Sequence, residues 1–206
     1  MAPISSTLYV LILIYFSFST ISFVKAQIPN DEVPAELQFL TTGEYDTWTP
    51  PSDIAKNYPY YLSGFDDQNR PIWVLEFGKW DIRAALLKDE EYVKALDMHI
   101  DQATWNFFTS TVLRASPDAP NKEFIVLIDA EGYNLAQLNS AKAVSFVVRK
   151  LTMITIATRF ASSVYAVNVN FAAERLLSLL KPFLGREFEK FIIFGTNSAM
   201  YIYQRS

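Results

Sequence analysis

Two carboxylates close together in the sequence are the groups best placed for acid–base chemistry. Asp129 and Glu131 follow an apolar run, Phe124 to Ile128. Open α/β sheets bind ligands at the carboxyl ends of their strands, so these side chains could serve as an acid and a base. A small α/β hydrolase using Asp129 and Glu131 is therefore one alternative. The simpler interpretation is that Asp129 caps the turn before Gly132, because aspartate side chains close such turns readily.

The rest of the sequence offers little other chemistry. The one histidine, His99, lies beside the apolar stripe of its segment, which predicts a solvated side chain and not a metal ligand or a base. The chain has no cysteine, which removes disulfides, thiolate catalysis and cysteine-based metal sites. Its six glycines form no nucleotide-binding loop and no nucleophile elbow. We therefore expect no catalytic residue, no metal and no cofactor.

Length and charge limit the class of protein. The chain has 206 residues, half of them hydrophobic, which suffices for one domain with a full core. The net charge of -4 and the pI near 5.1 argue against a nucleic-acid partner, whose phosphates favour a basic face. We expect a monomer that does not bind nucleic acid.

The N-terminal segment predicts export. Leu8 to Val24 is largely apolar, and Val24 and Ala26 suit cleavage after Ala26, so residues 1–26 are interpreted as a signal peptide of a secreted protein. The segment before the apolar run has no Lys or Arg, which leaves an uncleaved membrane anchor as the alternative. Residues 27–50 are a proline-dotted lead-in, and residues 51–206 form the domain.

The order of apolar runs predicts the fold that must position these groups. A short capped helix is expected near Leu37, a second one over 53–57 with Ser52 as its cap, and a turn over 64–71. Strands are expected over residues 72–78, 124–128, 164–169 and 191–194, and helices over 89–115, 140–158 and 171–184. Strands and helices that alternate in this way predict an α/β fold with a mainly parallel sheet and flanking helices.

The segment from Phe171 to Leu184 is unusually apolar. Its only polar residues before Pro182 are Glu174, Arg175, Ser178 and Lys181. A helix that is apolar on most of its circumference is buried on two sides, or covers something apolar that is not protein. An ordinary buried crossover helix and a helix that covers a ligand are both open at this point.

Several pieces of the chain, in order, resemble the CRAL-TRIO lipid-binding domain family. They are Tyr58 to Asp66, Ile125 to Gly132, Val167 to Asn170, Lys181 to Leu184 and Glu189 to Gly195. The resemblance implies that the segment 171–184 is the family's gate helix over an apolar cavity floored by the sheet. It also implies binding of a phospholipid or a tocopherol-like or retinoid-like molecule, with transfer at a transient membrane contact as a further expectation, and without catalysis.

The resemblance also nominates ligand-binding residues. On the gate helix these are Phe171, Leu176, Leu179, Leu180 and Phe183. On the sheet they are Trp73, Leu75 and Phe77, which share one face by the period-two rule, and Ile125 and Leu127, which share a face with each other. Which face looks into the cavity stays open.

Two departures from the family pattern bear on the ligand. Lys190 matches a lysine that helps hold the headgroup in phosphatidylinositol binders, but the glutamate that acts with it has no counterpart near Arg159. Family members also continue beyond the last strand, so we expect a shortened C-terminal form. An interaction scaffold with a collapsed cavity is a further alternative.

Overall fold

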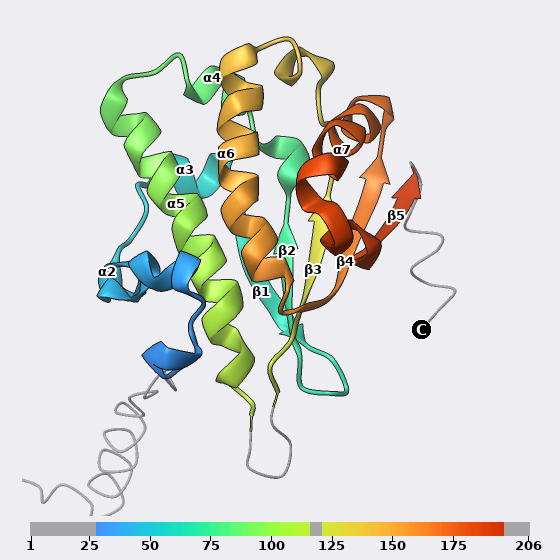
Figure 1. Ribbon diagram of the computed structural model, residues 1–206. Coiled ribbons are helices and arrows are strands. Elements are labelled where there is room, and N and C mark those ends of the chain that lie inside the picture. The colour runs from blue at the N-terminus through green and yellow to red at the C-terminus, as the bar shows by residue number, and fades with distance from the viewer. Residues whose placement is uncertain (1–27, 116–120, 196–206) are drawn as a thin grey trace, which may run out of the picture.

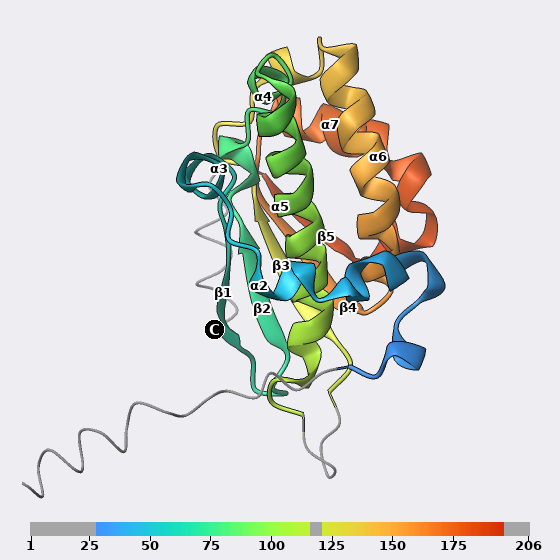
Figure 2. The same ribbon diagram turned by 90° about the vertical axis from the view of Figure 1, so that its left-hand side faces the viewer.

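The computed structural model describes residues 28–115 and 121–195 (Figure 1). The expected signal peptide and the expected shortened C-terminus lie outside these residues. The described chain forms one five-stranded sheet in the order β1-β2-β3-β4-β5. Figures 1 and 2 show the three long helices α5, α6 and α7 on the same face of this sheet. Crossovers between parallel strands are right-handed, so strands added in one direction place all their helices on one face.

The sheet confirms the mainly parallel α/β prediction. Its strands are β1 (Tyr60–Phe65), β2 (Pro71–Leu75), β3 (Phe124–Asp129), β4 (Ala161–Val169) and β5 (Phe191–Gly195). β1 is antiparallel to β2, and the pairs β2–β3, β3–β4 and β4–β5 are parallel.

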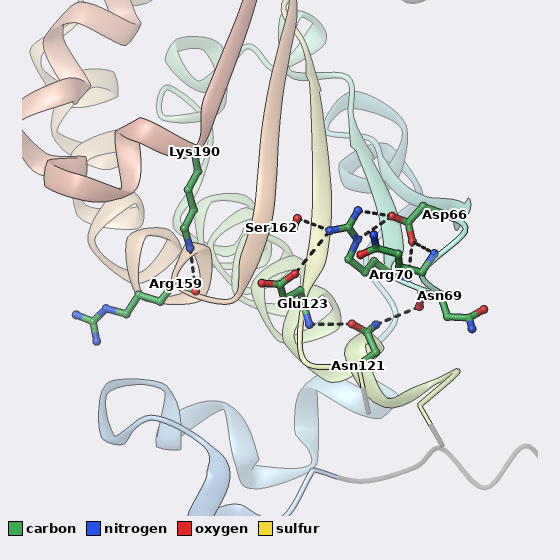
Figure 3. Close-up of polar contacts among 9 residues, drawn as sticks. Asp66, Asn69, Arg70, Asn121, Glu123, Arg159, Ser162 and Lys190 are labelled. Atoms are coloured by element: carbon green, nitrogen blue, oxygen red, sulfur yellow. Dashed lines mark hydrogen bonds and ion pairs between the residues drawn. The ribbon is translucent and has the colours of Figure 1, made fainter. Parts of the chain in front are cut away.

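The expected turn over residues 64–71 begins too early, because β1 runs to Phe65. The turn is closed by Asp66, whose carboxylate accepts hydrogen bonds from the amides of Gln68 (3.0 Å) and Arg70 (2.8 Å). The Arg70 side chain pairs with the same carboxylate and donates to Ser162 at the start of β4 (Figure 3). These contacts join the hairpin to the rest of the sheet.

The three long helices begin at capping side chains. They are α5 (Glu90–Thr109), α6 (Ala141–Thr158) and α7 (Phe171–Leu184). Asp89, Ser140 and Asn170 each accept a hydrogen bond from a backbone amide in the first turn of the helix that follows. α7 has the bounds expected from the sequence. α5 is shorter than expected, because the chain tightens into the 3₁₀ helix η4 after Thr109.

The short elements are α2 (Glu44–Thr47), α3 (Ser52–Asn57), α4 (Ile82–Ala85), η1 (Asn30–Glu32), η2 (Ala35–Thr42), η3 (Phe77–Lys79), η4 (Ser110–Val112), η5 (Leu135–Gln137) and η6 (Gly185–Lys190). Two expectations are corrected here. Ser52 is the first residue of α3 and not its cap, because the extended backbone of Pro51 precedes it directly. The expected strand over residues 72–78 ends at Leu75, and Phe77 lies in η3.

The lead-in packs on the helical layer. Leu37 and Leu40 of η2 are fully buried in one cluster with Trp105 and Phe108 of α5. The Gln102 amide donates to two backbone carbonyls of the lead-in, and Trp105 donates to Asp46. The lead-in therefore shares an apolar cluster with α5 and α6, separate from the clusters that contain the strands.

Candidate ligand-binding cavity

A cavity of about 150 Å³ lies between the sheet and the three long helices. Its lining is almost entirely apolar. The sheet contributes Leu75, Phe124, Val126, Ile128, Val164, Ala166, Val169 and Phe191; α5 contributes Ile100, Ala103, Thr104 and Phe107; α6 contributes Phe146, Val147, Lys150, Leu151, Ile154, Ala157 and Thr158; α7 contributes Ala173, Leu176, Leu177, Leu180 and Leu184; the loops and short helices contribute Phe77, Trp80, Ile82 and Ala130. An apolar cavity of about 150 Å³ holds a molecule of the size of benzene.

The strand register decides which sheet residues face the cavity. Leu75 pairs with Ile128, and both line it. Ile125 and Leu127 pair with Ile72 and Val74, so their side chains lie on the opposite face of the sheet. The nominated residues of β3 are therefore not cavity residues in this structure.

Three β3 residues that were not nominated, Phe124, Val126 and Ile128, line the cavity instead. The alternation that selected Ile125 and Leu127 also marks this second set. Of the nominated residues before β3, Leu75 and Phe77 line the cavity. Trp73 is buried on the same face but outside the lining, where its indole donates to Ser110 at 2.9 Å.

α7 presents two different faces. Leu176 and Leu180 are buried and line the cavity, together with Ala173, Leu177 and Leu184, which were not nominated. Phe171, Leu179 and Phe183 are 60%, 43% and 52% exposed and do not line it. The apolar circumference of α7 is thus buried on the cavity side and exposed on the outer side in this conformation. Contact of these three side chains with a ligand stays a prediction.

Lys190 has a structural role in this conformation. Its ammonium donates to the backbone carbonyl of Arg159 at 2.9 Å (Figure 3). It also donates to the backbone carbonyl of Thr158 at 2.7 Å and pairs with Glu187 at 3.1 Å. A cation at this place satisfies the free carbonyls at the C-terminus of α6 and opposes the negative end of its dipole. Lys190 does not line the cavity, and its binding of a headgroup stays a prediction.

The polar groups in the lining are engaged within the protein. The hydroxyls of Thr104 and Thr158 donate to the carbonyls of Ile100 and Thr155. The ammonium of Lys150 is held by Asp97 and Asp101.

The surroundings shift the pKa values of Asp97 and Asp101 in opposite directions. Burial raises the pKa of Asp101. Burial acts in the same direction on Asp97, but hydrogen bonds and charge from Arg149 and Lys150 outweigh it and lower the pKa of that carboxyl.

His99 is buried, and the expectation of a solvated side chain is wrong. It is 3% exposed, and its Nε2 lies 2.9 Å from the carbonyl oxygen of Tyr58. The rings of Trp48 and Tyr60 pack beside it. These rings come from the lead-in and β1, which were not expected to cover α5. Burial lowers the pKa of His99.

The carboxylates considered for catalysis lie at a turn. One oxygen of Asp129 accepts from the Glu131 amide and from the Asn168 side chain, both at 3.0 Å, as a turn cap does. Within residues 28–115 and 121–195, no cluster of three or more His, Cys, Asp or Glu side chains could hold a metal ion. None of the helices in that part of the chain is long and apolar enough to cross a membrane.

Comparison with known proteins identifies the family. The model of the CRAL/TRIO domain matches residues 55–205, and the chain belongs to this family. The crystal structure of Sfh5 is similar, with a TM-score of 0.55 and 13% sequence identity, over 82% of this chain and 62% of the Sfh5 chain. At this identity the similarity shows the fold. No curated protein matches the chain.

Family membership and fold together support the binding of a lipid or another small lipophilic molecule. CRAL-TRIO proteins are carriers of such molecules and not enzymes.

Proposed function

We propose that this protein binds a small hydrophobic molecule between the sheet and α7, and that α7 is the gate helix through which the molecule enters and leaves. The observation that carries the proposal is the apolar cavity lined by Leu176 and Leu180. Its volume of about 150 Å³ holds only part of a phospholipid, tocopherol-like or retinoid-like ligand. Loading a whole ligand therefore requires α7 to move away from the sheet.

The outer face of α7 suits a transient contact with a membrane. Phe171, Leu179 and Phe183 are exposed there, and the same helix carries Arg175 and Lys181. Arg175 stacks on the Phe171 ring at 4.9 Å. Apolar side chains beside cations suit the interface of an anionic bilayer. Insertion of these side chains would favour the outward position of α7 during transfer.

We further propose that the protein is secreted after cleavage behind Ala26, because the first 26 residues have the composition of a signal peptide. N-terminal sequencing of protein recovered from the culture medium of expressing cells tests this. A sequence starting at Gln27 supports it. Full-length protein retained in the membrane fraction would support the anchor alternative.

Native mass spectrometry of the purified protein, followed by denaturation and lipid mass spectrometry of what is released, tests the carrier function. A stoichiometric hydrophobic compound is expected. The variant Ala173→Leu fills the cavity with apolar volume and should lose this compound while staying folded. Ala84→Leu, the same change at an exposed position of α4 outside the cavity lining, is the control and should keep it.

Each alternative predicts a different observation. A well-folded but empty protein that takes up no lipid from phosphatidylcholine vesicles would point to the interaction scaffold. Turnover of an ester substrate that is lost in Asp129→Asn would point to the hydrolase.

A further inference from the structure

The wall of the cavity contains one charged side chain among the described residues, that of Lys150 on α6. Its ammonium has three acceptors, all on α5. They are a carboxylate oxygen of Asp101, a carboxylate oxygen of Asp97 at 3.0 Å and the backbone carbonyl of Asp97 at 3.1 Å. A lysine ammonium has three N–H donors. The three acceptors therefore leave Lys150 without a donor for a ligand.

The charge of Lys150 is also balanced within the protein. Arg149 pairs with Asp97 at 2.6 Å, so two cations face two carboxylates between α5 and α6. A carboxylate or phosphate that entered the cavity would lose its hydration without gaining a free cation. It would also lie close to the two aspartates. An anion is therefore disfavoured in this cavity.

The remaining polar groups of the cavity wall can still accept a hydrogen bond from a ligand. The hydroxyls of Thr104 and Thr158 use their protons on backbone carbonyls, at 3.1 Å and 2.7 Å. Their oxygens keep free lone pairs. A ligand hydroxyl can donate to such an oxygen, whereas a carboxylate, which only accepts, cannot bind to it.

We propose that the cavity selects neutral hydrophobic molecules, hydrocarbons or long-chain alcohols, over anionic lipids, and that Asp101 sets this selectivity by holding Lys150. This inference rests on the proposed function, because it specifies the ligand class of the same cavity. Asp101 acts through Lys150 and is a specificity-determining residue without contact to the ligand.

Two probes of equal chain length test the selectivity. Binding of 1-hexadecanol and of hexadecanoate is measured at pH 7.5 by displacement of the neutral fluorophore N-phenyl-1-naphthylamine. The alcohol is expected to bind at least about tenfold more tightly than the acid, because only the acid has to bury a charge that no free cation of the cavity balances. Equal affinities, or tighter binding of the acid, would overturn the proposal.

Two variants test the role of Asp101. Asp101→Leu removes one acceptor of Lys150 and one negative charge, and should raise the affinity for hexadecanoate at least about tenfold while leaving that for the alcohol unchanged. Glu91→Leu makes the same charge change on the exposed face of α5 and should alter neither affinity. Asp101→Asn is the second variant if the first does not fold, and is expected to act in the same direction by a smaller factor.

The double variant Asp101→Leu/Lys150→Gln removes the released ammonium and should abolish the gain for the acid. A selectivity in Asp101→Leu, or in Asp101→Asn where that variant replaces it, that equals the selectivity of the parent protein would overturn the role of Asp101. Failure of both probes to bind the parent protein would contradict the carrier function itself. Binding of both with equal affinity would contradict the selectivity alone.

Discussion

α5 and α7 both cover the same face of the sheet, but the structure holds them there in different ways. α5 is joined to its surroundings by side-chain hydrogen bonds: Gln102 binds the lead-in and Tyr60, Trp105 binds Asp46, and His99 binds the Tyr58 backbone. Across the described part of the chain, the side chains of α7 make no hydrogen bond or ion pair with another element. Its cap Asn170 makes one, to the Tyr133 carbonyl at 2.9 Å.

The difference shows which helix can move away from the sheet with the smaller loss of free energy. Displacing α5 would break a polar network and leave buried groups without partners. Displacing α7 breaks mainly apolar contacts, and a ligand or a membrane can replace those. Both helices line the cavity, and α7, which has the weaker attachment of the two, is the one suited to act as a gate.

The largest effect is expected from truncating the core of α5. Leu96 is fully buried, and Leu96→Ala should lower the free energy of unfolding by about 2–5 kcal/mol. Leu180→Ala on α7 should also destabilise the protein, but 1-hexadecanol should stabilise this variant more than Leu96→Ala. Leu180 lines the cavity and Leu96 does not, so only the Leu180 truncation makes room for a tighter-binding ligand, and tighter binding to the folded state gives more stabilisation. Urea denaturation with and without the alcohol measures both effects. Equal rescue of the two variants would contradict the comparison.

A smaller loss is expected from the polar attachment of α5. Gln102→Ala leaves the carbonyls of Tyr45 and Trp48 without their donor, and should cost about 1–3 kcal/mol of unfolding free energy. The control, Ser178→Ala on α7, removes a hydroxyl that binds only within its own helix. It should change stability by less than about 0.5 kcal/mol. A loss at Ser178 equal to that at Gln102 would argue against a special role for the α5 network.

The burial of His99 predicts a pH dependence that belongs to the α5 side of the molecule. Its folded-state pKa lies below the ordinary value of 6.5, so the unfolded chain takes up a proton more readily than the folded one. The His99 contribution to stability is therefore present above pH 6.5 and is lost as the pH falls below it. Denaturation midpoints between pH 8 and pH 5 measure this. His99→Gln should flatten the curve, and an unchanged slope would contradict the assignment.

The smallest change in stability, with a larger change in function, is expected on the outer face of α7. Phe183 is 52% exposed, so Phe183→Ser should alter the unfolding free energy by less than about 0.5 kcal/mol. It should nevertheless weaken binding to vesicles that contain phosphatidylserine, measured by co-sedimentation. Phe39→Ser, at an exposed phenylalanine of the lead-in, is the matched control. Equal weakening by both variants would show that α7 has no special part in the membrane contact.

The sequence supported the fold prediction where a local rule was sufficient. The alternation of apolar runs gave the parallel strands β2 to β5 and the bounds of α7, because hydrophobic periodicity and capping depend on neighbours in the chain. β1 was missed, because Ser63 and Gly64 within it resemble a turn. Its place in the sheet depends on pairing with β2, which is a contact between separate segments.

The candidate site was predicted only in outline. Period-two alternation grouped Leu75 with Trp73 and Ile125 with Leu127, but it could not say which group faces the helices. Leu176 and Leu180 were nominated together with Leu179, since an apolar segment does not reveal which side of a helix packs against the sheet. Burial of His99 required the lead-in and β1 to lie over α5, and no local pattern contains that information.

By itself, the sequence determined the class of fold, because that depends on the order and periodicity of residue types along the chain. The family and the expectation of a hydrophobic ligand came from the resemblance of several pieces of the chain to CRAL-TRIO proteins. Tertiary structure alone decided which strand face forms the cavity, which face of α7 lines it, and that Lys150 is fully engaged by Asp97 and Asp101. The physical reason is that the strand register and the packing of α5 against α6 bring together residues about 50 positions apart.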